Sequence, residues 1–429
     1  MAQQITDQIK SEITISLNKI IQNKDYDALL NFFIDFYNFF VKSTESFENY
    51  TECFEFIEPF AQNYGNYLRG QLPSYSKSSK ENSQKICYFF PNIDSDLAHI
   101  ELFYSMLKEH DSTSELKIFV ASFSSVKYKS KYIKELELKK KIFVIPIEFS
   151  NNGLISFLKK FISHDFSQLV VVSVPYILQV LLRALTPKKV IWLSMKFELR
   201  CFNDLINRVS FQSSSGDTFN HEKIRWYRNT PALLNHNIQY NGPSNTNSIK
   251  FLTINREEKI RDPEFLESVA QILLNTQNSS FSWTGRMEDL AILDFFKNKN
   301  LEKRVYYIGW VAPYLLVNDF DIFLDVPKLS GYVPAQYFAA GVPLVSFKNS
   351  NSWIEFFEEE FQNNPSFRSE DFIAQNSFQY INLATELAKN FNLRQSQSIL
   401  QKELGLSFYN TKKMYESHIE IIKSIIQGI

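Results

Sequence analysis

The stretch that decides the fold runs from Arg304 to Phe347 and reads RVYYIGWVAPYLLVNDFDIFLDVPKLSGYVPAQYFAAGVPLVSF. Its apolar runs and turns predict a strand, a glycine turn, a short helix, a strand, a loop, a helix and a strand. Each strand hands the chain to a helix at the carboxyl edge of a parallel sheet, where open α/β sheets bind ligands. Gly309 and Gly331 open two of these turns. The stretch therefore predicts a ligand site in the second half of the chain.

Two series of short apolar runs surround this stretch. Runs rich in Val, Ile and Phe are typical of strands that are buried on both faces of a parallel sheet. The first series comprises Ile86–Phe90, Leu116–Ala121, Ile142–Ile147, Leu169–Val174 and Val190–Leu193. The second begins at Ile249–Ile254, and a polar stretch with turn residues, Tyr240–Ser248, separates the two. The sequence thus predicts two α/β domains in tandem.

The fold class that we predict is α/β, with two Rossmann-like domains facing across a cleft and an N-terminal helical extension. Apolar residues at helical spacing, beginning with Ile5, Ile9 and Ile13, indicate the extension. The predicted divisions are a helical extension over 1–80, an N-terminal Rossmann-like acceptor domain over 85–240, a C-terminal Rossmann-like donor-binding domain over 249–410, and a helix over 411–429 that packs back toward the N-terminal domain.

Composition narrows the function classes. With 46 Lys and Arg against 47 Asp and Glu, no global positive charge drives binding to nucleic acid or to an anionic membrane. Cys53, Cys87 and Cys201 lack disulfide or metal-ligand spacing, which favours a reducing, cytoplasmic location. We expect no secretory signal and no transmembrane segment. Only 11 glycines are present, so a glycine-rich phosphate loop is not expected.

An anion site is predicted at the loop glycine Gly331. Main-chain N–H groups of Gly331–Val333 precede a helix that we expect to start near Pro334, and helix N-termini favour anions such as a diphosphate. The alternative is that these glycines and prolines are ordinary turn residues.

The same order of elements resembles the nucleotide-sugar-binding half of the GT-B glycosyltransferases. Ala339–Val345 resembles the helix-to-strand step that follows their donor site. Gln336 falls where those enzymes place an acidic residue that holds the ribose hydroxyls, and its amide can still accept a hydrogen bond. The paired-Glu motif of the large retaining class is absent, since Lys328 stands at its first position.

Two stretches resemble glycosyltransferase family 41, which contains the O-GlcNAc transferases and the bacterial cytoplasmic N-glycosyltransferases. Asn255–Pro263 is similar to a segment whose lysine contacts the donor diphosphate, and Lys259 is the matching position. Arg304–Pro313 is similar to a uracil-binding turn, in which a main-chain group at Ala312 would pair with the base. Tyr314 could stack in place of the family's histidine, and Tyr332-Val333 replace its threonine pair.

The resemblance implies a set of donor-binding residues: Lys259, Arg256, Gly309, Ala312, Tyr314, Gly331, Tyr332, Val333 and Gln336. A fixed cation beside the leaving diphosphate would stabilise its growing charge, so neither a metal nor another cofactor is expected. Asp319 and Asp321 precede an apolar strand, which favours a capping or solvated role over a metal site. The alternative for Lys259 is a surface lysine in a charged run.

The candidate catalytic residues are Asp94, Asp96 and His99, which follow the first apolar run at its predicted turn. A histidine can take a proton near neutral pH, and a carboxylate can orient an acceptor group. The alternative is a helix cap with a packed histidine. Lys196 could likewise meet donor phosphate or remain solvated, and Arg225–Arg228 could hold an acceptor or form an edge strand.

The function that these features predict is the transfer of a hexose or N-acetylhexosamine from a UDP-sugar to a protein side chain, with inversion and without a metal. The expected partners are the UDP-sugar donor and a protein or glycan acceptor, and not nucleic acid. One alternative is a GT-B transferase that acts on a glycan or lipid-linked glycan for a surface polysaccharide. Another is a non-catalytic GT-B-like binding or chaperone subunit.

Overall fold

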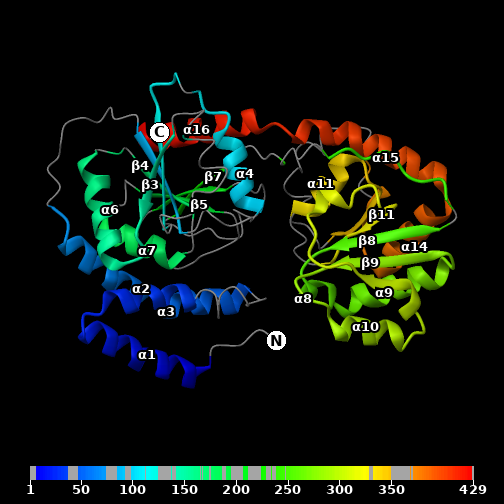
Figure 1. Ribbon diagram of the computed structural model, residues 1–429, viewed down its shortest axis with the longest axis horizontal. Helices are drawn as coiled ribbons and strands as arrows, with labels where there is room; N and C mark the ends of the chain where they lie inside the picture. Colours follow the sequence, from blue (N-terminus) through cyan, green and yellow to red (C-terminus); the bar gives the residue numbers. More distant parts are fainter. Residues whose placement is uncertain are drawn as a thin grey trace. The chain divides into compact units, whose positions relative to one another are not determined.

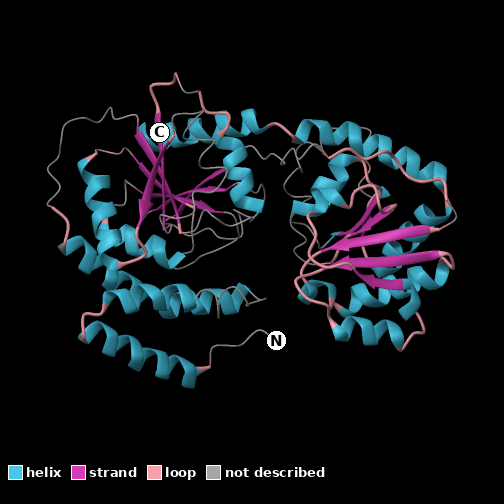
Figure 2. Ribbon diagram, viewed as in Figure 1, coloured by secondary structure: helices cyan, strands magenta, loops and turns pink. Residues whose placement is uncertain are grey.

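The computed structural model describes residues 6–36, 47–73, 85–91, 98–111, 113–123, 137, 142–164, 166, 168–172, 175–185, 190–194, 206–210, 224–228, 233, 238–246, 248–327, 332–348, 368 and 371–427. The chain forms two compact units. The first comprises Met1–Thr230 with Lys412–Ile429, and the second comprises Pro231–Thr411. In each unit a parallel sheet lies between layers of helices (Figures 1 and 2).

The first unit is built on a seven-stranded sheet in the order β3-β2-β1-β4-β5-β6-β7, and all its strand pairs are parallel. Its strands are β1 (Lys85–Phe90), β2 (Lys117–Phe123), β3 (Phe143–Ile147), β4 (Gln168–Val171), β5 (Val190–Ser194), β6 (Ile206–Ser210) and β7 (Ile224–Arg228). Its helices are α1 (Asp7–Gln22), α2 (Tyr26–Phe36), α3 (Phe47–Gly70), α4 (Ala98–Leu107), α6 (Asn151–Ser163), α7 (Pro175–Ala184) and α16 (Thr411–Gln427).

The N-terminal helices share one hydrophobic core with this sheet. Leu30 and Phe33 of α2 belong to the same buried cluster as Phe89 of β1. Helix α3 lies against α7 at Gly65, where an added Cβ would come within 2.6 Å of the Val180 carbonyl oxygen. Because even one methyl group would clash there, the extension is an integral layer of the first unit.

Helix α16 covers the opposite face of the sheet. Its His418 is fully buried, and Nε2 lies 2.8 Å from the hydroxyl of Tyr88 on β1. His110 Nδ1 lies 2.6 Å from the Tyr415 hydroxyl. Burial lowers the pKa of His418 to about 3, because the charged ring would lose its hydration. Two imidazole–phenol contacts thus hold the C-terminal helix.

The second unit is built on a six-stranded parallel sheet in the order β10-β9-β8-β11-β12-β13. Its strands are β8 (Ile249–Ile254), β9 (Ser279–Thr284), β10 (Val305–Tyr307), β11 (Ile322–Leu324), β12 (Leu344–Phe347) and β13 (Ile373–Ala374). Its helices are α8 (Glu257–Ile260), α9 (Pro263–Asn275), α10 (Leu290–Lys297), α11 (Tyr332–Ala340), α14 (Ser377–Lys389) and α15 (Phe391–Gly405), with short 3-10 turns η4 (Glu302–Arg304), η5 (Pro313–Leu315) and η8 (Leu406–Phe408).

Helices cover both faces of the second sheet. One buried cluster joins alternate strand residues, such as Phe251 and Trp283, to α9, α10 and α14. The other joins Leu252 and Phe323 to α11 and η8. Since strand side chains alternate between faces, continuous apolar runs such as Phe251–Leu252 serve both clusters. The predicted α/β fold class is therefore confirmed.

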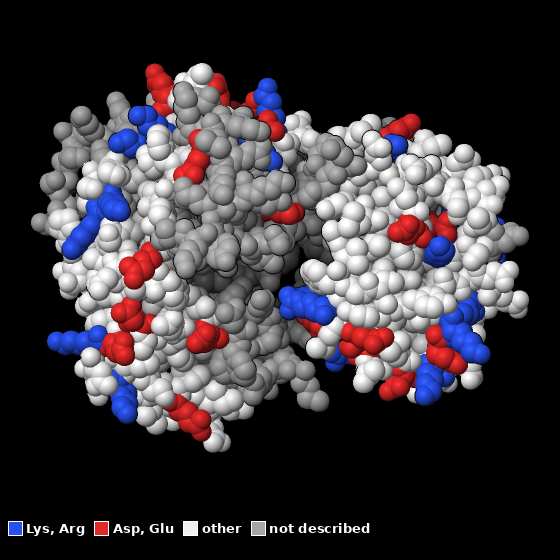
Figure 3. All heavy atoms as spheres, viewed as in Figure 1, with Lys and Arg blue, Asp and Glu red and all other residues white. Residues whose placement is uncertain are grey.

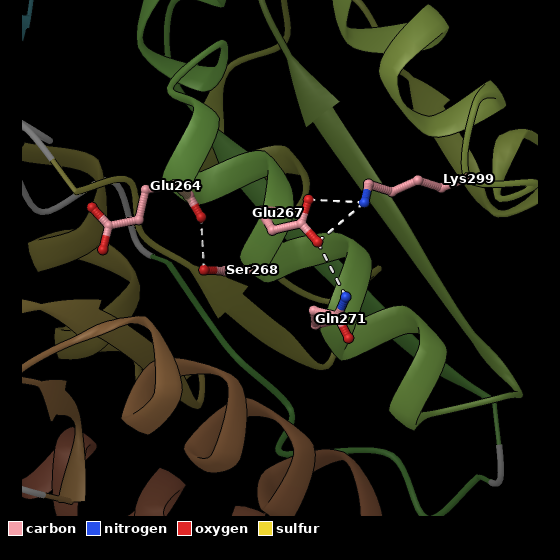
Figure 4. Close-up of polar contacts among 5 residues, drawn as sticks. All are labelled: Glu264, Glu267, Ser268, Gln271 and Lys299. Atoms are coloured by element: carbon pink, nitrogen blue, oxygen red, sulfur yellow. Dashed lines mark hydrogen bonds and ion pairs between the residues drawn. The ribbon is translucent and has the colours of Figure 1, made fainter.

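Helix α9 shows why these segments form helices. Asp262 caps it by accepting from the amides of Glu264 and Phe265 at 3.0 and 3.2 Å, and Pro263 occupies the first turn. On its solvent face, Glu267 forms an ion pair with Lys299 at 2.8 Å and accepts from Gln271 (Figure 4). The hydrogen bond from Lys299 lowers the pKa of Glu267. The opposite face of α9 packs in the hydrophobic core.

A buried polar network occupies the amino edge of the second sheet. Asp321, just before β11, accepts a hydrogen bond from the Lys250 amide at 2.9 Å and also bonds Ser244. Arg394 of α15 is 2% exposed and donates to the carbonyls of Leu387, Ala388 and Ser244 at 2.6, 3.0 and 3.0 Å. Burial lowers the pKa of Arg394.

This network fixes the stretch that the sequence shows as a polar boundary. Tyr240 is buried in a cluster of the second unit, and the Leu233 amide donates to the Phe408 carbonyl at 2.7 Å. The division between the two units consequently falls after Thr230, earlier than Tyr240–Ser248. Composition shows that the segment is polar, but it does not show that individual contacts such as these hold it against the second unit.

On the face of the molecule shown in Figure 3, the described acidic and basic side chains are interspersed over both units. Among the described helices, none combines the length and apolar character needed to cross a bilayer.

Candidate functional site

The strand order of the second sheet locates its ligand edge. Strand β8 pairs with β9 on one side and with β11 on the other. From β8 the chain proceeds outward to β9 and β10, then returns to the opposite side for β11 and β12. The connections after β8 and β11 therefore leave in opposite directions. In open α/β sheets the crevice at such a switch point, beyond the carboxyl ends of the strands, is where ligands bind.

Two cations follow the carboxyl end of β8. Arg256 precedes α8, and its Nη1 lies 3.0 Å from Glu258 Oε1 in a half-buried ion pair. Lys259 lies in α8, and its amide donates to the Arg256 carbonyl at 3.0 Å. The short helix thus places Lys259, the predicted diphosphate contact, and Arg256, another predicted donor-binding residue, within one turn of the switch point.

Asn255 presents an amide at the same position. Its Nδ2 is buried and has no hydrogen-bond partner in the structure, in which residues 248–327 are described without a gap. A buried N–H group without an acceptor costs about 1–3 kcal/mol. An oxygen atom of a ligand at the switch point would satisfy it.

Glu257 joins the loops after β8 and β9. The residue is 9% exposed, and its Oε2 accepts a hydrogen bond from the Arg286 amide at 3.0 Å. A Cβ added at Gly285 would lie 3.0 Å from the same oxygen, so the turn passes directly beside the carboxylate. In the sequence Glu257 appears only as part of a charged run, and its burial was not predicted.

The loop after β10 is held by main-chain contacts. Gly309 adopts a φ of +81°, which favours glycine, and its carbonyl accepts from the Gly285 amide at 3.4 Å. Tyr337 of α11 donates to the Pro313 carbonyl at 2.8 Å. Ala312 therefore lies in an ordered turn, between Gly309 and η5, and Tyr314 is 43% exposed.

The other side of the switch point is formed by β11 and α11. Asp325 is fully buried at the end of β11, where Oδ2 accepts from the Ser346 hydroxyl at 2.7 Å. Tyr332 and Val333 are the first residues of α11 and are half-buried. Helix α11 begins at Tyr332, two residues before the start predicted near Pro334, so this proline occupies the third position of the helix. Gln336 is 6% exposed.

The structure describes the predicted residues unequally. Gly331, Asp94 and Asp96 lie outside the described residues, as does Lys196. His99 belongs to α4, but its side chain is not described. Strand β7, which contains Arg225–Arg228, is an edge strand, the structural alternative for that stretch. In the part of the chain that is described, no group of three or more His, Cys, Asp or Glu residues is arranged to hold a metal ion.

Comparison with known proteins shows similarity in structure and none in sequence. No protein-family pattern and no curated protein matches the sequence. The O-GlcNAc transferase of Thermobaculum terrenum matches with a TM-score of 0.60 at 12% identity, over 90% of this chain and 79% of that one. A glycosyltransferase from Rickettsia africae matches with a TM-score of 0.55 at 13% identity, over 81% of this chain and 100% of that one.

A third match is the lipopolysaccharide outer core galactosyltransferase WaaB. Its TM-score is 0.53 at 12% identity, over 79% of this chain and 99% of that one. The fold of this chain is therefore that of the GT-B glycosyltransferases, as the resemblance implies.

Proposed function

We propose that this protein is a glycosyltransferase whose second unit binds a UDP-sugar at the switch point between β8 and β11. The observation that carries the proposal is the grouping of Arg256, Lys259 and the partnerless amide of Asn255 at the carboxyl end of the central strand. Cations and N–H donors at this edge suit a diphosphate. The GT-B fold supports a sugar nucleotide as its carrier.

The proposed chemistry is substitution at the anomeric carbon of the sugar. An acceptor oxygen or nitrogen forms the new bond, the bond to the diphosphate breaks, and the electron pair leaves with the diphosphate. Lys259 and Arg256 would balance the added negative charge, so that the reaction proceeds without a metal. Attack from the face opposite the leaving group inverts the anomeric centre. Asp94, Asp96 or His99 would orient the acceptor and accept its proton.

The proposed acceptor is a protein side chain, in a cytoplasmic setting. The resemblance of Asn255–Pro263 and Arg304–Pro313 to family 41 supports it. A second candidate acceptor is a glycan or lipid-linked glycan, which the shared fold with WaaB favours. A non-catalytic subunit, the third candidate, would bind a glycoprotein without hydrolysing or transferring the sugar.

Calorimetric titration with UDP-, GDP-, CMP- and dTDP-sugars tests the donor. We expect binding of a UDP-sugar that weakens about tenfold or more in Lys259→Ala, because a charge-assisted hydrogen bond contributes ~1.5–3 kcal/mol. The matched control is Lys250→Ala, an exposed lysine at the opposite edge of the same sheet. It should leave the affinity unchanged. Binding of only a GDP- or CMP-sugar would overturn the UDP assignment.

Donor turnover separates an enzyme from a binding subunit. We expect slow release of UDP from the bound UDP-sugar without an acceptor, and faster release with an acceptor. Incubation with a peptide mixture and, separately, with a saccharide mixture distinguishes the two acceptor classes by mass spectrometry. A protein that binds the UDP-sugar but never releases UDP would be a binding subunit.

A further inference from the structure

Glu257 is a buried carboxylate at an edge where the proposed ligand is an anion. A negative charge there opposes the binding of a diphosphate, so we expect the Glu257 carboxylate to have a role other than contact with the ligand. Buried carboxylates are retained where hydrogen bonds stabilise them. The Arg286 amide donates such a hydrogen bond to Glu257 Oε2, at 3.0 Å.

The turn that Glu257 holds contacts the next loop in two places. The Gly285 amide donates to the Gly309 carbonyl at 3.4 Å. The Tyr307 hydroxyl of β10 donates to the Gly285 carbonyl at 2.9 Å. A continuous series of contacts thus connects α8, which contains Lys259, with the turn that leads to Ala312.

We propose that Glu257 is a positioning residue that fixes the loops after β8, β9 and β10 relative to one another through the Arg286 amide. The consequence of this inference rests on the proposed function. The phosphate side of the site, at Lys259, and the base side, at Ala312, keep the separation that a nucleoside diphosphate requires. Binding such a ligand then needs little loop ordering, which otherwise weakens affinity.

Gly285 lies beside the carboxylate of Glu257, so a substitution there can test the same contact. An added Cβ would meet Oε2 at 3.0 Å and the Met287 carbonyl oxygen at 3.4 Å. Because the carboxylate is the end of a flexible side chain, it can move aside and break its bond to the Arg286 amide. Gly285→Ala therefore disturbs the contact between Glu257 and the Arg286 amide without changing either residue.

Three variants and one control test the proposal. Glu257→Leu removes the acceptor, Glu257→Gln keeps an oxygen that can accept from the Arg286 amide, and Gly285→Ala displaces the carboxylate. Glu267→Gln is the control, since it changes an exposed carboxylate on the solvent face of α9. Hydrogen exchange of the Arg286 amide reports on the contact whether or not the protein binds a nucleotide.

We expect the Arg286 amide to exchange about tenfold faster or more in Glu257→Leu and in Gly285→Ala, and at the wild-type rate in Glu257→Gln and in the control. For UDP, we expect affinity to fall about tenfold in the first two variants and by less than about twofold in Glu257→Gln. In turnover assays of Glu257→Leu and Gly285→Ala, KM for the UDP-sugar should rise more than kcat falls. The Tm of Glu257→Gln should equal that of the wild type.

Unchanged exchange of the Arg286 amide in both Glu257→Leu and Gly285→Ala would overturn the inference. A Glu257→Gln variant as impaired as Glu257→Leu would also overturn it, because charge and not the accepting oxygen would then matter. If Glu257→Leu fails to fold, Gly285→Ala and Glu257→Gln still decide. If wild-type protein binds no nucleotide, the proposed function fails while the exchange measurement still tests the positioning contact.

Discussion

The two edges of the second sheet both hold charged side chains, but they use them differently. At the amino edge, Arg394 and Arg304 each donate three hydrogen bonds within the fold, mainly to main-chain carbonyls. At the carboxyl edge, Arg256 forms a half-buried pair with Glu258, and the exposed Arg261 pairs with Asp289, whose side chain is 8% exposed. Among the described residues, each edge holds a buried N–H group without a partner, Arg394 Nε at the amino edge and Asn255 Nδ2 at the carboxyl edge. The edges differ in what their arginines bind: main-chain carbonyls of the fold at the amino edge, and acidic side chains at the carboxyl edge.

The difference shows that buried charge alone does not identify a functional site. Asp321 and Arg394 are more deeply buried than Arg256, yet they bind the polar stretch before β8, β8 itself and the end of α14. Their role is to hold the unit together. The direction of the strands distinguishes the edges, because helix N-termini and open loops gather only where parallel strands end.

The largest effect that we expect comes from the amino edge. Arg394→Met should destabilise the second unit by ~3–5 kcal/mol, because it leaves the Leu387 and Ser244 carbonyls and the Asp321 carboxylate without their cation. Urea unfolding measures the change. Arg368→Met, which removes an exposed arginine paired with Asp371, is the control and should change stability by less than about 1 kcal/mol. Equal losses of stability in the two variants would show that the buried Arg394 stabilises the unit no more than an exposed arginine does.

Two glycines with similar backbone conformations give the next comparison. Gly341 has a φ of +87°, and a Cβ there would lie 2.7 Å from the Ser398 carbonyl oxygen. Gly341→Ala should cost ~2–4 kcal/mol, from left-handed strain and overpacking together. Gly309→Ala should cost only ~1–2 kcal/mol, since nothing lies within 4 Å of its added Cβ.

Thermal unfolding measures the stability of both glycine variants, and UDP titration measures their affinity for the nucleotide. We expect Gly309→Ala to weaken UDP binding more than its loss of stability suggests, because the turn before Ala312 must change. A Gly309 variant that is less stable than the Gly341 variant would contradict the idea that the carboxyl edge is the open one.

The smallest effect that we expect is at an ion pair of the carboxyl edge. Arg261 Nε lies 2.5 Å from Asp289 Oδ2, and the arginine side chain is 46% exposed. Arg261→Met should change the free energy of unfolding by no more than ~1 kcal/mol, and by less at high salt, because solvent and ions screen the pair. Urea unfolding at two salt concentrations checks this. A loss as large as that of Arg394→Met would show that this edge is also structural.

Part of the fold could be read from residue patterns because those patterns act locally. Runs such as Ile249–Ile254 predict buried strands, as observed. The turn at Gly309 was predicted at the end of a strand, where it lies. The placement of Asp94, Asp96 and His99 stays a prediction.

Other features depend on neighbours that are distant in sequence. Glu257 contacts a turn 29 positions away, and the Arg394–Ser244 bond spans 150 positions. No periodicity distinguishes a buried glutamate or arginine from a solvated one in a charged run. Tyr240, in a polar stretch, is likewise buried by partners that the local sequence does not contain.

The sequence by itself determined the alternation of strands and helices, the division into two α/β units and the turns where ligands are expected, since backbone propensity and hydrophobic spacing act over a few residues. Only the tertiary structure decided which charges are buried, which main-chain carbonyls the arginines of the amino edge bind, and that Glu257 accepts a hydrogen bond from the turn after β9. The reason is that burial and hydrogen bonding depend on which distant segments the parallel strand order brings together.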